Sequence, residues 1–202
     1  MKSRPAYYLV DDYPALHDIC RNWEIIRNEF LALNPPLMQI SRGTSWDIDM
    51  QNVAEAIKNG INYGWIKGWG PEGLSDKWLN YGLTTFNEQF NELIKGEFIN
   101  HLPKTYEMIR KIKGVKICGY ANLKPFSILH CHNHWEIYDE GLLQFHLPIV
   151  TAVEQNYAYL NVRGEFRQHI CGEPIIFDGS LDHFVLNESP SDRIILYMEF
   201  KK

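Results

Sequence analysis

The feature that most constrains the fold is a series of short, strand-like runs that fills the chain after Gly114. The runs are rich in β-branched and aromatic residues, and turn signals such as Arg163-Gly164 and Ser189-Pro190 separate them. They cover residues 115–123, 127–129, 142–150, 157–162, 165–170, 174–177, 184–186 and 193–200. Short strands at close, regular spacing are typical of a sandwich or a jelly-roll barrel, so an antiparallel β core is expected here.

The first half of the chain has helical periodicity instead. In residues 15–33, apolar side chains recur at three- and four-residue steps, which predicts an amphipathic helix ended by Asn34-Pro35-Pro36. Further helices are expected at 52–59, 84–98 and 103–112, a short strand at 7–10, and irregular structure at 37–50. We therefore expect a single domain over 1–202, in which 1–114 is mostly helical support and pocket wall and 115–202 is the β core.

Residues 61–83 are unusually aromatic, and this has two interpretations. The aromatic residues concerned are Tyr63, Trp65, Trp69, Trp78 and Tyr81. They form either a wall over a substrate pocket or an ordinary cover on the flank of a sheet, and general burial statistics favour the second.

Composition narrows the class of protein. The chain has 202 residues, 45% of them hydrophobic, and a net charge of −5 without a long basic run, so a nucleic-acid partner is not expected. No apolar run approaches the ~20 residues that span a bilayer, and residues 1–5 carry no apolar signal segment, so a cytoplasmic location is the expectation. The four cysteines include no Cys-x-x-Cys pair, which excludes a zinc ribbon or a thioredoxin-like motif.

Two histidine-bearing segments suggest a metal site. The first contains His130, His132 and His134, whose side chains would project together from an extended strand. Cys131 lies among them and is interpreted as a small buried thiol rather than a ligand. The second segment, residues 177–183, ends at His183. Imidazole suits iron, zinc, copper and nickel, so we expect the two segments to meet and hold one metal ion.

Arg193 strengthens this interpretation. It follows His183 by ten residues and begins an apolar run, where a lone buried charge needs a partner. A carboxylate of an acidic co-substrate would bind it through bidentate, charge-assisted hydrogen bonds. The alternative partner is an internal acid, Glu199 or Asp192.

Residues 117–200 resemble the aspartyl/asparaginyl β-hydroxylase family of Fe(II)- and 2-oxoglutarate-dependent oxygenases. The segment from Phe177 to Val185, followed by Arg193, resembles that family's second metal histidine and its 2-oxoglutarate arginine. The run from Gln144 to Ile149 resembles its Arg-aromatic-His-hydrophobic strand. The fold that this resemblance implies is mainly β with N-terminal helices, around a double-stranded β-helix (jelly-roll, cupin-like) core.

The resemblance also implies a set of ligands. Fe(II) would bind His132 and His183, and 2-oxoglutarate would bind the metal with its far carboxylate on Arg193. His146 would help to hold the keto-acid end of 2-oxoglutarate, and dioxygen would be the second co-substrate. The implied activity is hydroxylation of an unactivated C–H bond in an amino-acid-like or peptidyl substrate, because the metal and co-substrate carry such chemistry.

Two positions depart from the family pattern. Many members have a carboxylate where this chain has His134, which leaves His134 as a third ligand, an outer-shell group or a bystander. A missing carboxylate also keeps halogenation as a minor alternative. Gln144 stands where the family usually has arginine, so the anchoring of 2-oxoglutarate or of an acidic substrate differs here.

Two other functions remain as alternatives. One is a zinc-dependent hydrolase or isomerase on a cupin-like barrel, and the other is a non-catalytic protein that binds metal or a small acid. The segment between the histidine motifs, residues 135–140, is either a substrate-gating loop or a solvated hairpin connection.

Overall fold

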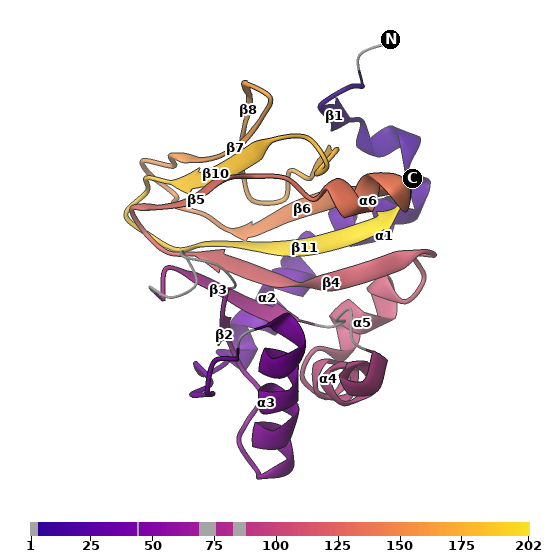
Figure 1. The fold of residues 1–202 in the computed structure, drawn as a ribbon. Helices are drawn as coiled ribbons and strands as arrows, with labels where there is room; N and C mark the ends of the chain where they lie inside the picture. Colours follow the sequence, from indigo (N-terminus) through magenta and orange to yellow (C-terminus); the bar gives the residue numbers. More distant parts are fainter. Residues whose placement is uncertain (1–3, 44, 69–75, 83–87) are drawn as a thin grey trace.

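The computed structural model describes residues 4–43, 45–68, 76–82 and 88–202, and it contains two antiparallel sheets packed face to face (Figure 1). The large sheet has the order β1-β9-β6-β11-β4-β3-β2 and the small sheet the order β5-β10-β7-β8. The strands are β1 Tyr7–Tyr8, β2 Ile66–Lys67, β3 Trp78–Gly82, β4 Val115–Leu123, β5 Ser127–His132, β6 Leu142–Val150, β7 Ala158–Val162, β8 Glu165–Gln168, β9 Ile175–Phe177, β10 His183–Asn187 and β11 Arg193–Lys201.

The strands from β4 onward form a double-stranded β-helix. The chain passes repeatedly between the sheets, because β4, β6, β9 and β11 lie in the large sheet while β5, β7, β8 and β10 form the small one. The expected jelly-roll core is therefore confirmed, and each of the runs predicted after Gly114 contains one strand. The periodicity did not predict that β2 and β3, from the N-terminal half, would extend the large sheet beside β4.

The helices precede the β-helix, apart from one short helix inside it. They are η1 Val10–Asp12 and η2 Pro14–Leu16, both 3-10, and α1 His17–Arg21, α2 Trp23–Leu33, α3 Trp46–Lys58, α4 Glu88–His101, α5 Pro103–Ile109 and α6 Trp135–Asp139. The single helix predicted for 15–33 is wrong in detail, because the chain breaks at Asn22 into α1 and α2. Helix α2 ends as expected at Asn34, which takes the left-handed conformation (φ 43°) just before Pro35.

Two other predictions need correction. Residues 37–50 are not all irregular, because α3 already begins at Trp46 and the Ser45 hydroxyl accepts a hydrogen bond from the amide of Ile48 as its N-cap. The strand predicted for 7–10 is only two residues long, since the chain turns into η1 at Val10. Of the helix predicted for 84–98, residues 84–87 lie outside the described residues.

A large apolar core fills the space between the large sheet and the helices, which cover the face away from the small sheet (Figure 1). Alternate residues of the central strands supply the sheet side of this core: Leu143, Phe145, Leu147 and Ile149 from β6, and Ile194, Leu196, Met198 and Phe200 from β11. The aromatic residues of the N-terminal half face them. Tyr63, Trp65 and Tyr81 are buried in this cluster, so for these three the sheet-cover interpretation is correct.

The other face of β6 and β11 points into the β-helix. In-register pairing places Arg193 opposite Leu123, and Leu123 belongs to a second apolar cluster that joins the two sheets. By strand alternation, Tyr197 and Glu199 share the face of Arg193, and they pair with His146 and Gln144 of β6. The interior of the β-helix is therefore partly polar, and it contains the residues that matter for function.

Candidate metal centre

Three histidines meet at one end of the β-helix. His132 ends β5, His183 begins β10, and His134 precedes the first residue of α6. One ligand nitrogen from each lies within 4.8 Å of the others. The ring centroids are 4.3 Å apart for His132 and His183, and 5.2 Å for His132 and His134. The predicted convergence of the two segments is present, and His134 takes part in it.

Strand pairing brings the segments together. His132 pairs directly with His183, whereas the next paired positions are Leu129 and Val185, so β5 has one extra residue in this stretch. This β-bulge changes the alternation between Leu129 and His132. His130 is exposed and does not join the histidine cluster, so the prediction that all three histidines project together is wrong. Cys131 is exposed too, which corrects its expected burial.

Further hydrogen bonds fix the geometry of the two segments. The amide of His134 donates to the carbonyl of Gly179 at 2.9 Å, and the Asn133 side chain donates to Asp182 at 2.7 Å. Within the second segment, Asp178 Oδ1 accepts from the amide and hydroxyl of Ser180 and closes a tight turn. The His132–His183 site is therefore built from a paired strand end and a hydrogen-bonded turn.

Each ring uses Nδ1 for a protein contact. His132 Nδ1 lies 2.6 Å from the carbonyl of His130, and His183 Nδ1 lies 2.8 Å from the carbonyl of Leu181. A carbonyl only accepts, so each Nδ1 carries a proton and each Nε2 keeps its lone pair. His134 Nδ1 lies 3.3 Å from a carboxylate oxygen of Glu136, which favours the same tautomer. Hydrogen bonds of this kind, from the ring nitrogen that does not bind the metal, orient metal-binding imidazoles.

Burial keeps His183 in the form that can bind a metal. Removal from water lowers its pKa to about 3, and the neighbouring His132 ring adds to this effect. The ring is therefore neutral at physiological pH, as ligation requires. Three imidazoles, each with one ring nitrogen at this short distance from the others, fit a transition metal such as iron or zinc.

Arg193 is buried in the interior with unsatisfied donors. It is 2% exposed, and its Nε and Nη1 have no hydrogen-bond partner among the residues that the structure describes. Burial lowers the pKa of the guanidinium to about 9. The internal acids considered from the sequence are not its partners, since Asp192 binds Asn122 and Lys124 while Glu199 binds Tyr197 and Gln144. The orphaned donors fit the far carboxylate of a dicarboxylic acid.

A buried histidine pair lies between these two sites. His146 Nδ1 and His169 Nε2 are 3.2 Å apart, and both rings are almost fully buried. Burial lowers the pKa of His146 well below its usual value, and the charges of Arg193 and His183 contribute to that shift. The Phe177 ring lies next to both His146 and His183, with ring centroids 4.9 Å and 5.3 Å away. No role was predicted for His169, because it lies outside both histidine motifs in the sequence.

Gln144 lies in a separate polar cluster. Its amide nitrogen donates to the Tyr197 hydroxyl at 2.7 Å and to Glu199 Oε1 at 3.3 Å, and the Tyr197 hydroxyl donates to the same carboxylate oxygen at 2.5 Å. Burial, together with the charge of Glu199, raises the pKa of Tyr197 well above its usual value, so the phenol stays protonated. Neither Tyr197 nor Glu199 was predicted to belong to the site.

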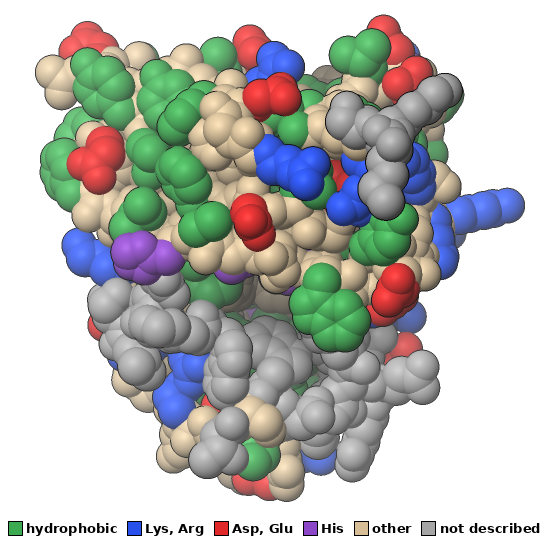
Figure 2. All heavy atoms as spheres, turned by 45° about the horizontal axis from the view of Figure 1, so that its top comes forward, with side chains coloured by type: hydrophobic (Ala, Val, Ile, Leu, Met, Phe, Trp, Pro, Cys, Tyr) green, Lys and Arg blue, Asp and Glu red, His purple; other side chains and the backbone are tan. Residues whose placement is uncertain are grey.

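The segment between the motifs is the short helix α6 rather than a loop. Trp135 and Tyr138 are 69% and 56% exposed, while Ile137 is fully buried. The guanidinium of Arg4 stacks on the Tyr138 ring at 4.2 Å and also lies 3.3 Å from Asp178. Figure 2 shows histidine side chains inside a recess of the molecular surface. Trp69, part of the predicted aromatic wall, lies outside the described residues.

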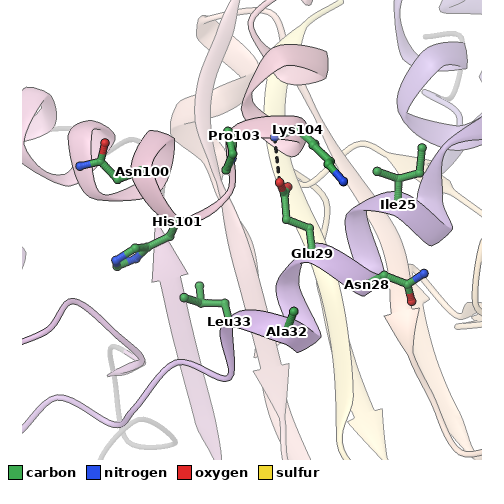
Figure 3. A pocket seen from close by; sticks show the side chains of 9 residues that line it. All are labelled: Ile25, Asn28, Glu29, Ala32, Leu33, Asn100, His101, Pro103 and Lys104. Carbon is green, nitrogen blue, oxygen red and sulfur yellow. Dashed lines mark hydrogen bonds between the residues drawn. The ribbon is translucent and has the colours of Figure 1, made fainter.

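A pocket on the helical side does not resemble a catalytic site. It has a volume of about 630 Å³ and lies between α2 and the junction of α4 with α5 (Figure 3). The N-terminus of α5 faces it, but the Glu29 carboxylate already accepts the amides of Lys104 and Thr105 at 2.8 Å. The protein's own carboxylate therefore fills the anion position at this helix end.

Comparison with known proteins relates this chain to hydroxylases. The family model described as aspartyl/asparaginyl beta-hydroxylase matches residues 20–202. A protein of Rhizobium tropici named ornithine lipid ester-linked acyl 2-hydroxylase is 23% identical over 126 residues, which is 62% of this chain and 42% of that protein. The chain thus spans less than half the length of this relative.

Solved structures with partial similarity include two β-barrel proteins. A predicted oxalate decarboxylase of Thermotoga maritima is 15% identical, with a TM-score of 0.36, and the match covers 48% of this chain and 74% of that one. A cupin domain of a transcriptional regulator of Enterobacter cloacae is 14% identical, with a TM-score of 0.35, over 43% and 81% of the two chains.

In the part of the chain that the structure describes, no helix has the length and apolar character to cross a bilayer.

Proposed function

The chain belongs to the aspartyl/asparaginyl β-hydroxylase family, and on that premise we propose that it is an Fe(II)- and 2-oxoglutarate-dependent dioxygenase. The observation that carries the proposal is the combination of three converging imidazoles with a buried arginine that has orphaned donors. A zinc hydrolase needs the imidazoles but has no use for the arginine. Oxidative decarboxylation of 2-oxoglutarate coupled to hydroxylation of a C–H bond uses both.

The residues have distinct roles in this proposal. His132 and His183 hold the metal, and His134 is the third ligand in the position where a carboxylate is common. Arg193 binds the far carboxylate of 2-oxoglutarate. His146, kept neutral by burial, lies between the guanidinium and the metal and orients the keto-acid end, while His169 fixes the position of the His146 ring.

The substrate is proposed to be amino-acid-like, either a peptidyl side chain or an amino-acid-containing lipid. The first class follows from the family, whose members are described as aspartyl/asparaginyl hydroxylases. The second follows from the relative named for hydroxylation of the acyl chain of ornithine lipid. In both classes the site must exclude water and position one C–H bond near the metal.

The test is succinate formation from 2-oxoglutarate by the Fe(II)-loaded protein, with and without dioxygen. We expect dioxygen-dependent succinate, lost in His183→Ala and retained in His130→Ala. The second variant is a matched control, because the His130 side chain is exposed and is not part of the cluster of His132, His134 and His183. Equal succinate formation with and without dioxygen, or full turnover in His183→Ala, would contradict the proposal.

A further inference from the structure

The interior of the β-helix has unsatisfied polar atoms of opposite kind at its two ends. At Arg193 the orphaned atoms are donors, Nε and Nη1. At the other end they are acceptors, namely Oε2 of Glu199 and Oε1 of Gln144. Arg193 and Glu199 are six positions apart on β11, which is about 20 Å along an extended strand. The two ends therefore cannot satisfy each other.

The acceptor end is buried, and two of its oxygens have no hydrogen-bond partner among the described residues. Glu199 is 2% exposed and Gln144 is 1% exposed, so water gives these atoms little compensation. The donors of the cluster, the Gln144 amide and the Tyr197 hydroxyl, are both directed at Glu199 Oε1 or at each other. Among the described residues, Glu199 forms no ion pair, and its second oxygen has no partner. A positively charged donor would satisfy a buried carboxylate in this state.

The acceptor end also lies beside the metal centre. The Gln144 side chain occupies the space next to Gly179, where an added Cβ would come within 2.2 Å of its Oε1. Gly179 is the residue whose carbonyl accepts the amide of His134. Glu136, the carboxylate next to His134 Nδ1, also acts on Tyr197, because its charge contributes to the raised pKa of that phenol.

We propose that Glu199, supported by Gln144, is the specificity-determining residue that binds a cationic amine of the substrate next to the metal. An ammonium group supplies three N–H donors and one positive charge, which match Glu199 Oε2 and Gln144 Oε1. This inference rests on the proposed hydroxylase function in one respect, namely that the bound amine belongs to a substrate. It narrows the substrate class to molecules that carry a free primary amine, and it assigns the anionic co-substrate to the Arg193 end.

The test is a binding measurement that requires no turnover. The zinc-loaded protein is titrated with n-hexylammonium, hexan-1-ol and hexanoate at neutral pH and physiological salt, and affinities are measured by ligand-observed NMR. We expect hexylammonium to bind at least about tenfold more tightly than hexan-1-ol, as a charge-assisted hydrogen bond provides. In Glu199→Gln, which keeps the shape and removes the charge, this preference should disappear. Glu165→Gln, an exposed carboxylate on β8, is the matched control and should keep it.

A second variant protects the test against misfolding. Gln144→Lys places an ammonium of the protein itself beside Glu199, so we expect it to fold, to raise the melting temperature and to abolish the preference for hexylammonium. The inference is wrong if the wild type shows no preference for the amine. It is also wrong if Glu199→Gln keeps the preference, which is the result expected when the amine coordinates zinc directly. Succinate formation is measured separately, so a failed amine test leaves the proposed hydroxylase function standing, and the reverse also holds.

Discussion

Arg193 is the residue for which the structure gives the sharpest prediction, because its replacement should change stability and ligand binding in opposite directions. Burial lowers the pKa of its guanidinium to about 9. This decrease corresponds to roughly 5 kcal/mol that disfavours the charged form in the folded protein. Because pH 7 lies below the pKa in both the folded and the unfolded state, the guanidinium is charged in both and this penalty is fully present. It would be relieved only as the pH rises above about 9.

The variant Arg193→Met keeps an unbranched side chain and removes the charge. Some of the penalty is offset, since the longer arginine stem also packs against its neighbours. We expect the metal-free protein to gain about 1–3 kcal/mol in its free energy of unfolding, as seen when buried charges give way to apolar residues. The affinity for 2-oxoglutarate should fall by about 2–5 kcal/mol, the usual cost of deleting one partner of a buried charge pair.

Urea unfolding of the metal-free protein and calorimetric titration of the manganese-loaded protein with 2-oxoglutarate measure the two quantities. Arg167→Met is a suitable control, because that guanidinium stacks on the Tyr7 ring at 5.0 Å, on the outer strand β8, and should affect co-substrate binding little. A loss of stability in Arg193→Met together with unchanged 2-oxoglutarate affinity would refute the reasoning, because it would show that internal contacts satisfy the arginine.

Four further predictions concern the site and its support. His134→Ala should lower zinc affinity about 10–100-fold, measured by competition with a chromophoric chelator, whereas an unchanged affinity would make His134 a bystander. Acidification of the metal-free protein from pH 7 to pH 4 should reduce the free energy of unfolding by up to about 3 kcal/mol through His183 alone. The reason is that its pKa rises from about 3 to 6.5 on unfolding, so the unfolded chain takes up an extra proton. A urea midpoint that stays constant over this pH range would exclude this effect. Gly179→Ala should cost about 1–3 kcal/mol, because the new Cβ collides with the Gln144 side chain, and equal melting temperatures would contradict that packing. Glu29→Ala should cost about 1–2 kcal/mol through the lost cap of α5 and leave metal affinity unchanged, which separates a stability effect from a site effect.

Strand-length runs and turn residues carried most of the information on the β core. The runs from 115 to 200 alternate or are continuously apolar, and their pairing follows from burial on one face, so their existence was predictable. The short β2 and β3 were not, because β2 has only two residues, β3 has aromatic residues on both faces, and their strand state depends on the pairing of β2 with β3 and of β3 with β4. The break at Asn22 was missed because the apolar period continues through it, while the Asn22 side chain donates locally to the carbonyl of Asp18 at 2.8 Å.

The candidate site shows the same division. His183 and Arg193 lie in a compact motif, and a local pattern is enough to find them. The separation of His130 from His132 depends on a β-bulge, whose extra residue is defined only relative to the partner strand β10. Glu199 was a candidate internal partner for Arg193 in the sequence. The two residues lie on the same face of β11, six positions apart, and this distance along an extended strand prevents their contact.

This separation also explains why the interior tolerates so many polar groups. Each of them lies on a strand whose opposite face contributes to the large apolar core, so the fold is stabilised on one face of β6 and β11 while the other face is free to carry chemistry. The cost of the polar face is two uncompensated charges of opposite sign, Arg193 and Glu199. An anionic co-substrate at one end and a cationic substrate group at the other would neutralise both, so each ligand should raise the stability of the protein by mass action and the two effects should add. If instead one ligand satisfied both ends, the second would bring no further increase in melting temperature.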